Sequence, residues 1–397
     1  MGCRIGAAPW VVTAMLGLAV EALAPPRAYA QEADSLRQLA ERLATVERQL
    51  EELEREKVSP TSISGYMDFH YNDFQPGGEQ LDFHRFVLLV AHEFSEDVRF
   101  YSELEVEHAF VKDGQGELEL EQAFIDFHLD PDVAIRAGIV LVPIGIQNER
   151  HEGPAYFGVE RHQVETVLIP TTWFEPGVGL FGRLAPGFDY KVYVLGSLDA
   201  TKFSAGGIRG ARSKGFFTNA ASPAVAGRLI YRGTPGLTLG ASIYRGDAGF
   251  DVPVSVVTTL YDVDAAYRYR FVELRGLWAQ TFVGNARELS QAIGLPADAP
   301  VGERMQGFSV EAAVHLLPEA HPWDLALFAR YEEADTQDRV PDGFTRAAQF
   351  DRDWTTVGAS FLPHPDVVVK ADYQFAGNDH STIEAIDSFN LGLSWWF

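Results

Sequence analysis

Charged side chains and bulky apolar ones are combined in residues 143–175, a long connection between regular segments. Its charged members include Glu149, Arg150, Glu152, Glu160, Arg161 and Glu165. Carboxylates and guanidinium groups held close together create a local field that selects ions and orients dipolar solutes in a narrow channel. The connection also holds Trp173 and Phe174, so we expect it to pack inside a cavity. These six charged residues are therefore predicted to form a pore constriction.

A second group of carboxylates follows a period of two. Glu103, Glu105 and Glu107 alternate along one segment, and residues 117, 119 and 121 repeat the pattern on the next. Alternate residues of a strand share one face, so an acidic wall is expected there. The residues predicted to line the pore are Glu103, Glu105, Glu107, Glu119, Glu121, Arg228, Arg268 and Arg330. Alternatively, part of the glutamate cluster lies on the extracellular rim and binds divalent cations with lipopolysaccharide.

A basic cluster lies in the connection 199–223. Its members are Lys202, Arg209, Arg212 and Lys214. Such a cluster either attracts anions to a channel mouth or contacts the phosphates of lipopolysaccharide. Both interpretations remain open from the sequence.

The histidines form no motif of catalysis or metal binding. His151 and His162 share a connection but lack the HExxH or CxxC spacing that fixes a metal, and no GxSxG occurs. We therefore expect no enzyme activity, catalytic residue, metal site or cofactor. The net charge of -24 excludes nucleic acid as a partner, because phosphate backbones need a basic surface.

The elements that position these residues are strands. In residues 261–270, apolar Tyr261 and Val263 alternate with polar Asp262 and Asp264, which predicts one face toward lipid and one toward a wet lumen. From residue 63 onward we count about 16 such segments, joined alternately by longer and shorter connections. The sequence thus predicts an all-β fold, a transmembrane antiparallel β-barrel over residues 63–397, with long extracellular loops and short periplasmic turns.

The C-terminal residues 389–397 carry apolar side chains at every second position and end on Phe397. An apolar edge strand invites aggregation unless the last strand pairs with the first, as in a closed barrel. Mean hydropathy is near zero, and after the N-terminal region no run approaches the roughly 18 apolar residues of a membrane-spanning helix. Both features predict a location in the bacterial outer membrane.

The N-terminal region is predicted to contain two further elements. Residues 1–30 read as a signal peptide, with Arg4 before an apolar stretch and an A-x-A site at residues 28–30. Residues 31–58 read as a periplasmic coiled-coil helix, because their leucines and Val46 are spaced alternately by three and four. The alternative is a single amphipathic helix on the barrel rim.

Residues 136–145, RAGIVLVPIG, and the connection after them resemble the phosphate-selective porin-like family of outer-membrane proteins. In that family, a loop following such a strand folds inward and helps to constrict the channel. Porin barrels of this kind are commonly trimeric, so the resemblance implies a homotrimer. Phosphate selectivity in the family rests on arginines and lysines along the pore, whereas the constriction predicted here mixes four Glu with two Arg.

The function expected from these features is a porin that passes small hydrophilic solutes or ions through a water-filled pore narrowed by residues 143–175. Its other partners would be outer-membrane lipid and lipopolysaccharide. Two alternatives remain: a phosphate- or anion-selective channel, and a non-conducting structural protein of the outer membrane.

Overall fold

A computed structural model describes residues 42–43, 45–46, 60–112, 115–380 and 382–397. The chain divides into two compact units, Met1–Ser59 and Pro60–Phe397. In the first unit the described residues, Arg42, Leu43, Thr45 and Val46, are helical. The predicted signal peptide and the rest of the predicted coiled coil lie outside the described residues, and both stay predictions.

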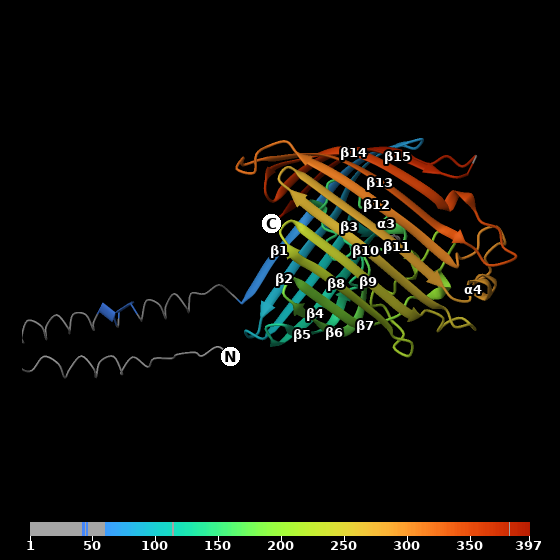
Figure 1. The fold of residues 1–397 in the computed structure, drawn as a ribbon, viewed down its shortest axis with the longest axis horizontal. Helices are drawn as coiled ribbons and strands as arrows, with labels where there is room; N and C mark the ends of the chain where they lie inside the picture. Colours follow the sequence, from blue (N-terminus) through green and yellow to red (C-terminus); the bar gives the residue numbers. More distant parts are fainter. Residues whose placement is uncertain (1–41, 44, 47–59, 113–114, 381) are drawn as a thin grey trace, which may run out of the picture. The chain divides into compact units, whose positions relative to one another are not determined.

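The second unit is a closed antiparallel barrel of sixteen strands, each paired with its neighbours in chain order (Figure 1). The strands are β1 (Thr61–Gln75), β2 (Glu79–Glu93), β3 (Val98–Lys112), β4 (Gln115–Asp130), β5 (Val133–Leu141), β6 (Phe174–Ala185), β7 (Phe188–Leu195), β8 (Ala224–Thr234), β9 (Leu237–Asp247), β10 (Val257–Tyr269), β11 (Val272–Val283), β12 (Arg304–His315), β13 (Asp324–Arg339), β14 (Asp351–His364), β15 (Val367–Asn378) and β16 (Asp387–Trp396). The helices of this unit are α3 (Gln163–Val167), α4 (Ala286–Ala292) and the 3-10 turns η1 (Gly153–Ala155), η2 (Ala200–Lys202), η3 (Arg209–Ala211) and η4 (Ala348–Phe350). The predicted all-β barrel is confirmed. No helix among the described residues has the length and hydropathy to cross a bilayer.

The barrel closes where the last strand meets the first. β1 and β16 pair from Tyr66 opposite Trp396 to Gln75 opposite Asp387. Beyond the ladder, Gly65 and Phe397 exchange two backbone hydrogen bonds of 2.9 Å, and the Phe397 ring stacks on Phe86 at 6.2 Å. The expectation that the apolar C-terminal strand closes the barrel is confirmed.

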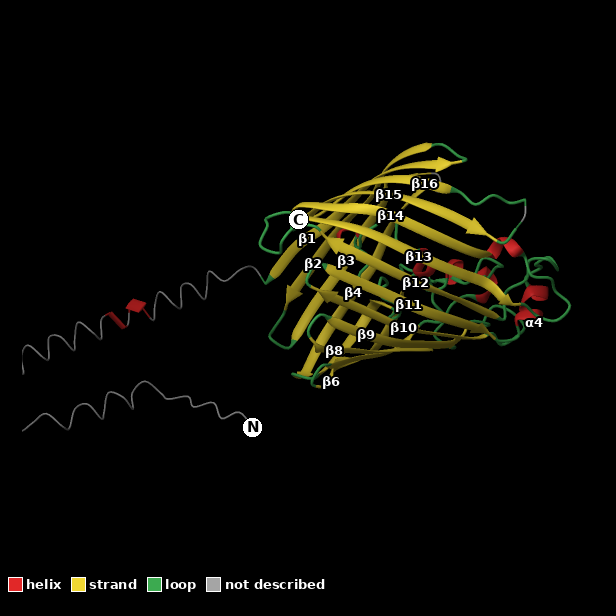
Figure 2. Cartoon of the chain, turned by 45° about the horizontal axis from the view of Figure 1, so that its top comes forward, coloured by secondary structure: helices red, strands yellow, loops and turns green. Residues whose placement is uncertain are grey.

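The two ends of the barrel differ in their connections. At the loop end, odd-numbered strands run into even-numbered ones, and residues 142–173, 196–223 and 284–303 form long connections. At the opposite turn end, where Figure 1 marks the C-terminus, most connections are tight, such as residues 186–187. Figure 2 shows the helices of this unit gathered inside the barrel and at the loop end.

One detail of the predicted alternation is wrong. The β1–β2 and β3–β4 connections are only residues 76–78 and 113–114, because the strands extend further than their apolar alternation does. β13 likewise continues to Arg339, through polar residues that carry no strand signal.

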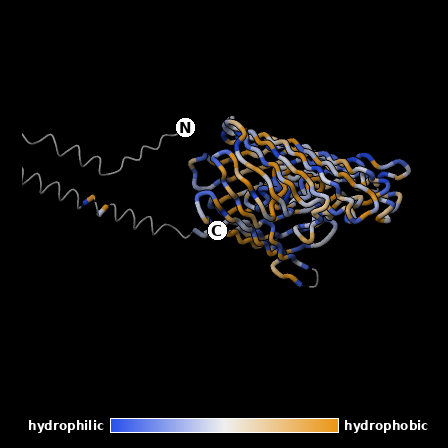
Figure 3. Tube along the Cα trace, turned by 90° about the horizontal axis from the view of Figure 1, so that it is seen from below, coloured by the Kyte–Doolittle hydropathy of each residue, from blue (hydrophilic) through white to orange (hydrophobic). Residues whose placement is uncertain are grey.

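The strands separate an apolar outer surface from an interior rich in charge. Hydrophobic and hydrophilic residues alternate along them in Figure 3. Exposed aliphatic side chains on the outer face include Leu118, Leu180, Val192, Val225, Ile243, Val263, Val310, Leu327, Val369 and Leu391. Near the turn end, exposed aromatic rings such as Tyr269, Phe271 and Trp323 follow this belt. An apolar band edged by aromatic rings is the surface that a bilayer requires.

The interior is not uniformly wet, which corrects the prediction of a polar lumen. A buried hydrophobic cluster fills part of the loop end, because the long connections fold their apolar residues into it. Trp173 packs on Tyr244 with ring centroids 4.6 Å apart, and Leu198 and Phe203 of the next long loop belong to the same cluster. Leu289 of α4 also contributes. Folded loops therefore occupy part of the barrel interior.

The closure predicts a specific sensitivity to side-chain volume at Gly65. A Cβ there would lie 2.1 Å from the Val87 carbonyl oxygen and 2.6 Å from the Phe397 ring, so Gly65→Ala must displace the backbone. We expect a loss of about 1–3 kcal/mol in the free energy of unfolding, measured by urea denaturation in micelles. Gly78→Ala is the matched control, because apart from its chain neighbours no described residue has an atom within 4 Å of the added Cβ. Equal stability of the two variants would contradict this description of the seam.

Candidate functional site: the inward loop and its cavity

Residues 142–173, here called the inward loop, connect β5 to β6 and pass through the barrel interior. The Val159 backbone N–H donates to Asp372 Oδ2 on β15 at 2.6 Å, and Ser360 Oγ on β14 donates to the Phe157 carbonyl at 2.6 Å. The loop thus reaches strands far from its own ends in the sequence. The structure agrees with the prediction that this connection folds inward.

The inward loop begins and ends at adjacent points of the wall. The Val142 N–H donates to the Trp173 carbonyl at 2.9 Å. The Asn148 side-chain amide donates to both the Val142 and Trp173 carbonyls, and its Oδ1 accepts from the Trp173 N–H at 2.7 Å. These bonds satisfy backbone groups that would otherwise be buried without partners.

Buried lysine holds the far side of the loop. Lys370 Nζ on β15 donates to the carbonyls of Gly153 and Gly158, the latter at 2.8 Å, and lies 4.1 Å from the centroid of the Tyr156 ring. A buried ammonium group needs such acceptors to offset its desolvation.

Histidine–carboxylate contacts join the loop to the acidic wall. His151 Nε2 lies 2.9 Å from Glu121 Oε2 on β4 and 3.7 Å from Glu103 Oε1 on β3, and all three side chains are buried. Burial disfavours the imidazolium, but the negative charge of Glu121 and the hydrogen bond to Glu103 outweigh it and hold the pKa of His151 well above its usual value. The two carboxylates therefore favour the charged form of the His151 imidazole.

Two more contacts of this kind lie elsewhere on the wall. His162 Nε2 is 3.3 Å from Glu311 Oε2 on β12. Glu160 Oε1 is 3.3 Å from His70 Nδ1 on β1. The loop is thus attached to three separate parts of the barrel through oppositely ionisable pairs.

The basic cluster of residues 196–223 serves the same loop. Arg209 donates to the carbonyls of Thr166 and Thr171, and Arg212 donates to those of Pro170 and Thr172. In these positions the guanidinium groups satisfy carbonyls at the C-terminal end of the inward loop.

Lys214 and Lys202 of that cluster also have partners, which are carboxylates. Lys214 Nζ bridges Glu117 and Glu119 on β4, and Lys202 lies 3.4 Å from Asp199. Burial opposes the charge on Lys214, yet its bonds to the two glutamates raise its pKa. All four basic residues suggested to attract anions to a channel mouth therefore already bind carbonyl or carboxylate groups.

A cavity of about 300 Å³ separates the inward loop from the inner face of β7–β11. Its charged lining residues are Glu149, Arg150, Lys191, Arg228, Arg232, Asp264, Glu273 and Arg275. Five are basic and three are acidic, which leaves a surplus of two positive charges. This cavity is the place where the predicted constriction meets solvent.

Most cations of the cavity are paired. Arg228 lies 2.7 Å from Asp264, Arg275 lies 2.6 Å from Glu273, and Lys191 Nζ binds Glu149. Arg150 is exposed and makes no ion pair with another described residue. Its charge is therefore the one most available to a passing ion.

The predicted constriction residues fall into distinct environments. Arg150 and Glu149 line the cavity, whereas Arg161 Nε donates to the His151 carbonyl at 3.3 Å. Glu152 is half-buried, and burial raises its pKa. Their effect on conduction stays a prediction.

Glu165 differs from the other predicted constriction residues because it is fully buried. The Gln147 N–H donates to its Oε2 at 2.7 Å, while Oε1 has no partner among the described residues. Burial raises the pKa of Glu165 to about 8, so its carboxyl group is protonated at neutral pH and adds no charge to a channel.

The residues predicted to line the pore all lie on strands, but few face water. Glu103, Glu105 and Glu121 point inward and are almost completely buried under the loops. Arg228 pairs with Asp264 as described, and Arg330 binds Glu332 at 2.8 Å. Glu103 and Glu121 contact His151 of the inward loop, and Glu105 contacts Arg85 of β2. These three carboxylates therefore do not form the water-exposed acidic wall that the sequence predicts.

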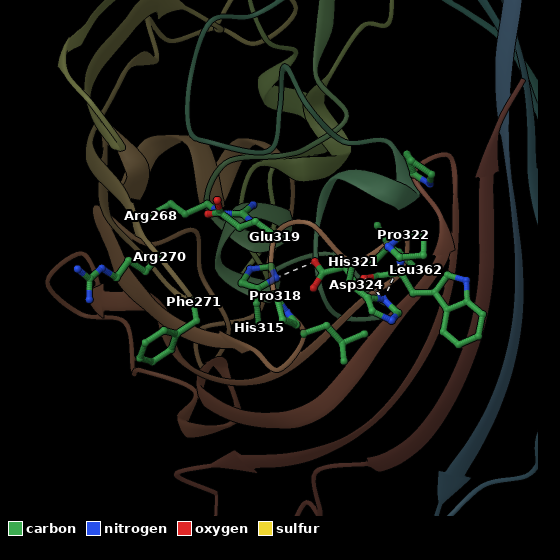
Figure 4. A pocket seen from close by; sticks show the side chains of 13 residues that line it. Arg268, Arg270, Phe271, His315, Pro318, Glu319, His321, Pro322, Asp324 and Leu362 are labelled. Carbon is green, nitrogen blue, oxygen red and sulfur yellow. Dashed lines mark hydrogen bonds and ion pairs between the residues drawn. The ribbon is translucent and has the colours of Figure 1, made fainter.

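The remaining members lie toward the barrel ends. Glu107 is half-buried and Glu119 is bound by Lys214, both toward the loop end. Arg268, about half exposed, lies at the turn end, where it lines a pocket of about 530 Å³ with Glu319 and His315 (Figure 4). The rim alternative for the glutamates thus fits only the outer part of the cluster.

Several residues that hold the site were not singled out from the sequence. Arg85 on β2 is buried between Asp68 at 3.4 Å and Glu105 at 4.0 Å, and Lys370 binds the loop. Their inward positions follow from alternation along the strands. Their partners do not, because they come from other strands or from the loop.

The closed sixteen-strand barrel, its apolar outer belt and its inward loop define an outer-membrane β-barrel of the porin type. Such a barrel lies in the bacterial outer membrane. No family model matches the chain. The chain belongs to the family of an uncharacterized protein of Aquifex aeolicus (strain VF5), with 32% identity over 350 residues, 85% of this chain and 80% of the relative.

Solved structures share the fold at low sequence identity. OmpF of Salmonella typhi matches with a TM-score of 0.57 and 14% identity, covering 85% of this chain and 97% of that chain. The anion-selective porin of Comamonas acidovorans matches with a TM-score of 0.56 and 11% identity, covering 85% and 99%. The channel DcaP of Acinetobacter baumannii gives 0.53 and 10%, covering 85% and 97%. These matches show the barrel fold.

The protonated state of Glu165 predicts a pH dependence of stability. Its pKa is raised from the ordinary value near 4.5 to about 8, so between these values the folded protein binds more protons than the unfolded chain, and stability falls as pH rises. Glu165→Gln removes this term. We expect the variant to gain stability relative to the wild type as urea denaturation is repeated from pH 5 to pH 8. A difference that does not change with pH would contradict a neutral Glu165.

Proposed function

We propose that this protein is a porin through which small hydrophilic solutes and ions diffuse, between the inward loop and the β7–β11 wall. The observation that carries the proposal is the cavity of about 300 Å³ beside the loop, lined by residues of five consecutive strands, β7–β11, and of the loop itself, with charged side chains from the loop and from every one of these strands except β9. A hydrated, charged passage beside an inward-folded loop is the arrangement expected of a selective diffusion channel.

A preference for anions is the second part of the proposal. The cavity carries two more positive than negative side chains, and Arg150 is its exposed cation without an ion pair among the described residues. The buried glutamates of β3 and β4 face His151 and Arg85 and do not line this cavity, so they do not favour cations at this point. This charge distribution supports the anion-selective alternative, with phosphate as one candidate solute, as the resemblance of residues 136–145 implies.

The expected partners and the orientation of the barrel follow from its class. The long connections would face the outside and contact lipopolysaccharide, with the tight turns in the periplasm. A homotrimer is consistent with the solved OmpT of Vibrio cholerae, a similar barrel described in a trimer form. The predicted coiled coil of residues 31–58 would add contacts between subunits. We infer no enzymatic role, because the buried histidines and glutamates are used to hold the loop.

The test is the reversal potential of the refolded protein in a planar bilayer under a KCl gradient. We expect an anion-preferring potential that Arg150→Gln shifts toward zero, because the substitution removes the exposed charge of the cavity. Arg339→Gln is the control, since Arg339 pairs with Glu303 at the end of β13, away from the cavity lining.

Three outcomes separate the alternatives. A cation-preferring wild type would contradict anion selectivity and leave the porin proposal standing. An unchanged potential in Arg150→Gln would remove Arg150 from the passage. Absence of conductance in the folded protein would overturn the porin proposal in favour of a structural role.

A further inference from the structure

We propose that Asp82, His84 and His108 form a binding site for one divalent transition-metal ion of the Zn²⁺ class, inside the barrel near the loop end. Each residue offers one ligand atom, and the three atoms lie within 4.8 Å of one another. The inference concerns a site separate from the cavity and does not depend on conduction through it.

The geometry is close to that of a metal site. Asp82 Oδ2 lies 3.0 Å from His84 Nδ1 and 2.8 Å from His108 Nδ1. Ligand atoms around a tetrahedral Zn²⁺ with bonds of about 2.0–2.1 Å are separated by about 3.3 Å. Small side-chain rotations would therefore let an ion bind between Asp82 and the two histidines, in place of the hydrogen bonds that now join them.

Both histidines are turned inward by irregularities in their strands. The β2 register against β1 shifts between Asp68 and His70, so that His84 joins Arg85 on the inner side while Phe83 packs outside on Phe69. An extra residue in one strand of a pair redirects a side chain in this way.

His108 is redirected by the second irregularity. The pairing of β3 with β4 is interrupted after Glu107, and His108 and Ala109 have φ values of 58° and 53°. Residues other than glycine rarely adopt this conformation. Without the interruption, strand alternation would place His108 on the outer face, opposite to the inward-facing Glu107. Two irregularities in adjacent strands thus bring two imidazoles to one carboxylate.

The chemistry selects a class of ion. Two imidazole nitrogens and one carboxylate suit Zn²⁺, Ni²⁺ or Cu²⁺ better than Ca²⁺ or Mg²⁺, which prefer oxygen ligands. The side chains are 17%, 23% and 46% exposed for Asp82, His84 and His108, so an ion and its remaining water ligands have access. By contrast, the buried set of Glu103, Glu121 and His151 is closed by its own contacts and holds the inward loop.

The surroundings connect the site to the inward loop. The His84 ring stacks on His70 with centroids 4.5 Å apart, and His70 is paired with Glu160 of the loop. Arg85, the nearest cation in the sequence, is committed to Asp68 and Glu105. An ion at the site would therefore not face a free arginine at Arg85, and the stacked His70 ring holds His84 in place.

The experiment is isothermal titration of the refolded full-length protein in micelles with ZnCl₂, in the absence of lipopolysaccharide. We expect one Zn²⁺ per chain with micromolar affinity. The variant His84→Ala/His108→Ala should bind at least about tenfold more weakly, because loss of ligands costs at least as much as loss of their supporting contacts. Circular dichroism reports whether the variant folds, and His108→Ala alone, at the most exposed ligand, replaces the double variant if it does not.

His364→Ala is the matched control, because His364 also lies beside an aspartate, Asp366 at 3.4 Å, but contacts no second histidine among the described residues. It should bind Zn²⁺ like the wild type. The proposal is overturned if the wild type takes up no Zn²⁺, if removal of His84 and His108 leaves the affinity unchanged, or if Ca²⁺ binds with the same affinity.

Discussion

The pairing of β1 with β16 is the contact on which the rest of the structure depends. A bilayer offers no partner for a free strand edge, so the chain must close on itself through this seam. Closure turns every second side chain toward an enclosed space. The apolar belt is thereby placed outside. Many charged residues are placed inside, and some of them are shielded from water. The folded loops of the interior are a consequence of that enclosure.

The inward loop resolves the problem of buried charge by bringing polar partners to buried carboxylates of the wall and to Lys370. Burying an unpaired carboxylate is costly, whereas a pair with good geometry and further hydrogen bonds offsets much of the desolvation. His151 faces Glu121, His162 faces Glu311, and Lys370 binds loop carbonyls. The loop also touches the opposite wall, where Glu149 binds Lys191 of β7 and the Gly145 N–H donates to Asp262 of β10, and the remaining cavity lies between the loop and β7–β11. The contacts of the inward loop thus have two results. They give polar partners to the buried charges of one wall, and they leave a cavity along the β7–β11 wall.

The sequence predicted the strands well because lipid imposes alternation. Apolar and polar residues alternate in residues 261–270, which predicts the two faces of a strand, and the apolar C-terminal strand predicts closure of the barrel. It predicted that residues 143–175 fold inward, from their aromatic and charged content. It did not show that Glu165 is neutral, nor that Arg85 and Glu105 meet, because burial and cross-strand partners depend on register. The inward position of His84 and His108 was also hidden, since an irregularity breaks the period from which faces are assigned.

Single-channel conductance before and after removal of the inward loop tests the central claim most directly. The Val142 N–H and Trp173 carbonyl are hydrogen-bonded, so residues 144–171 can be replaced by a short turn without moving β5 or β6. If the loop narrows the passage, the replacement raises conductance several-fold and weakens ion preference. Conductance that is unchanged in a folded barrel would contradict the claim that this loop forms the constriction.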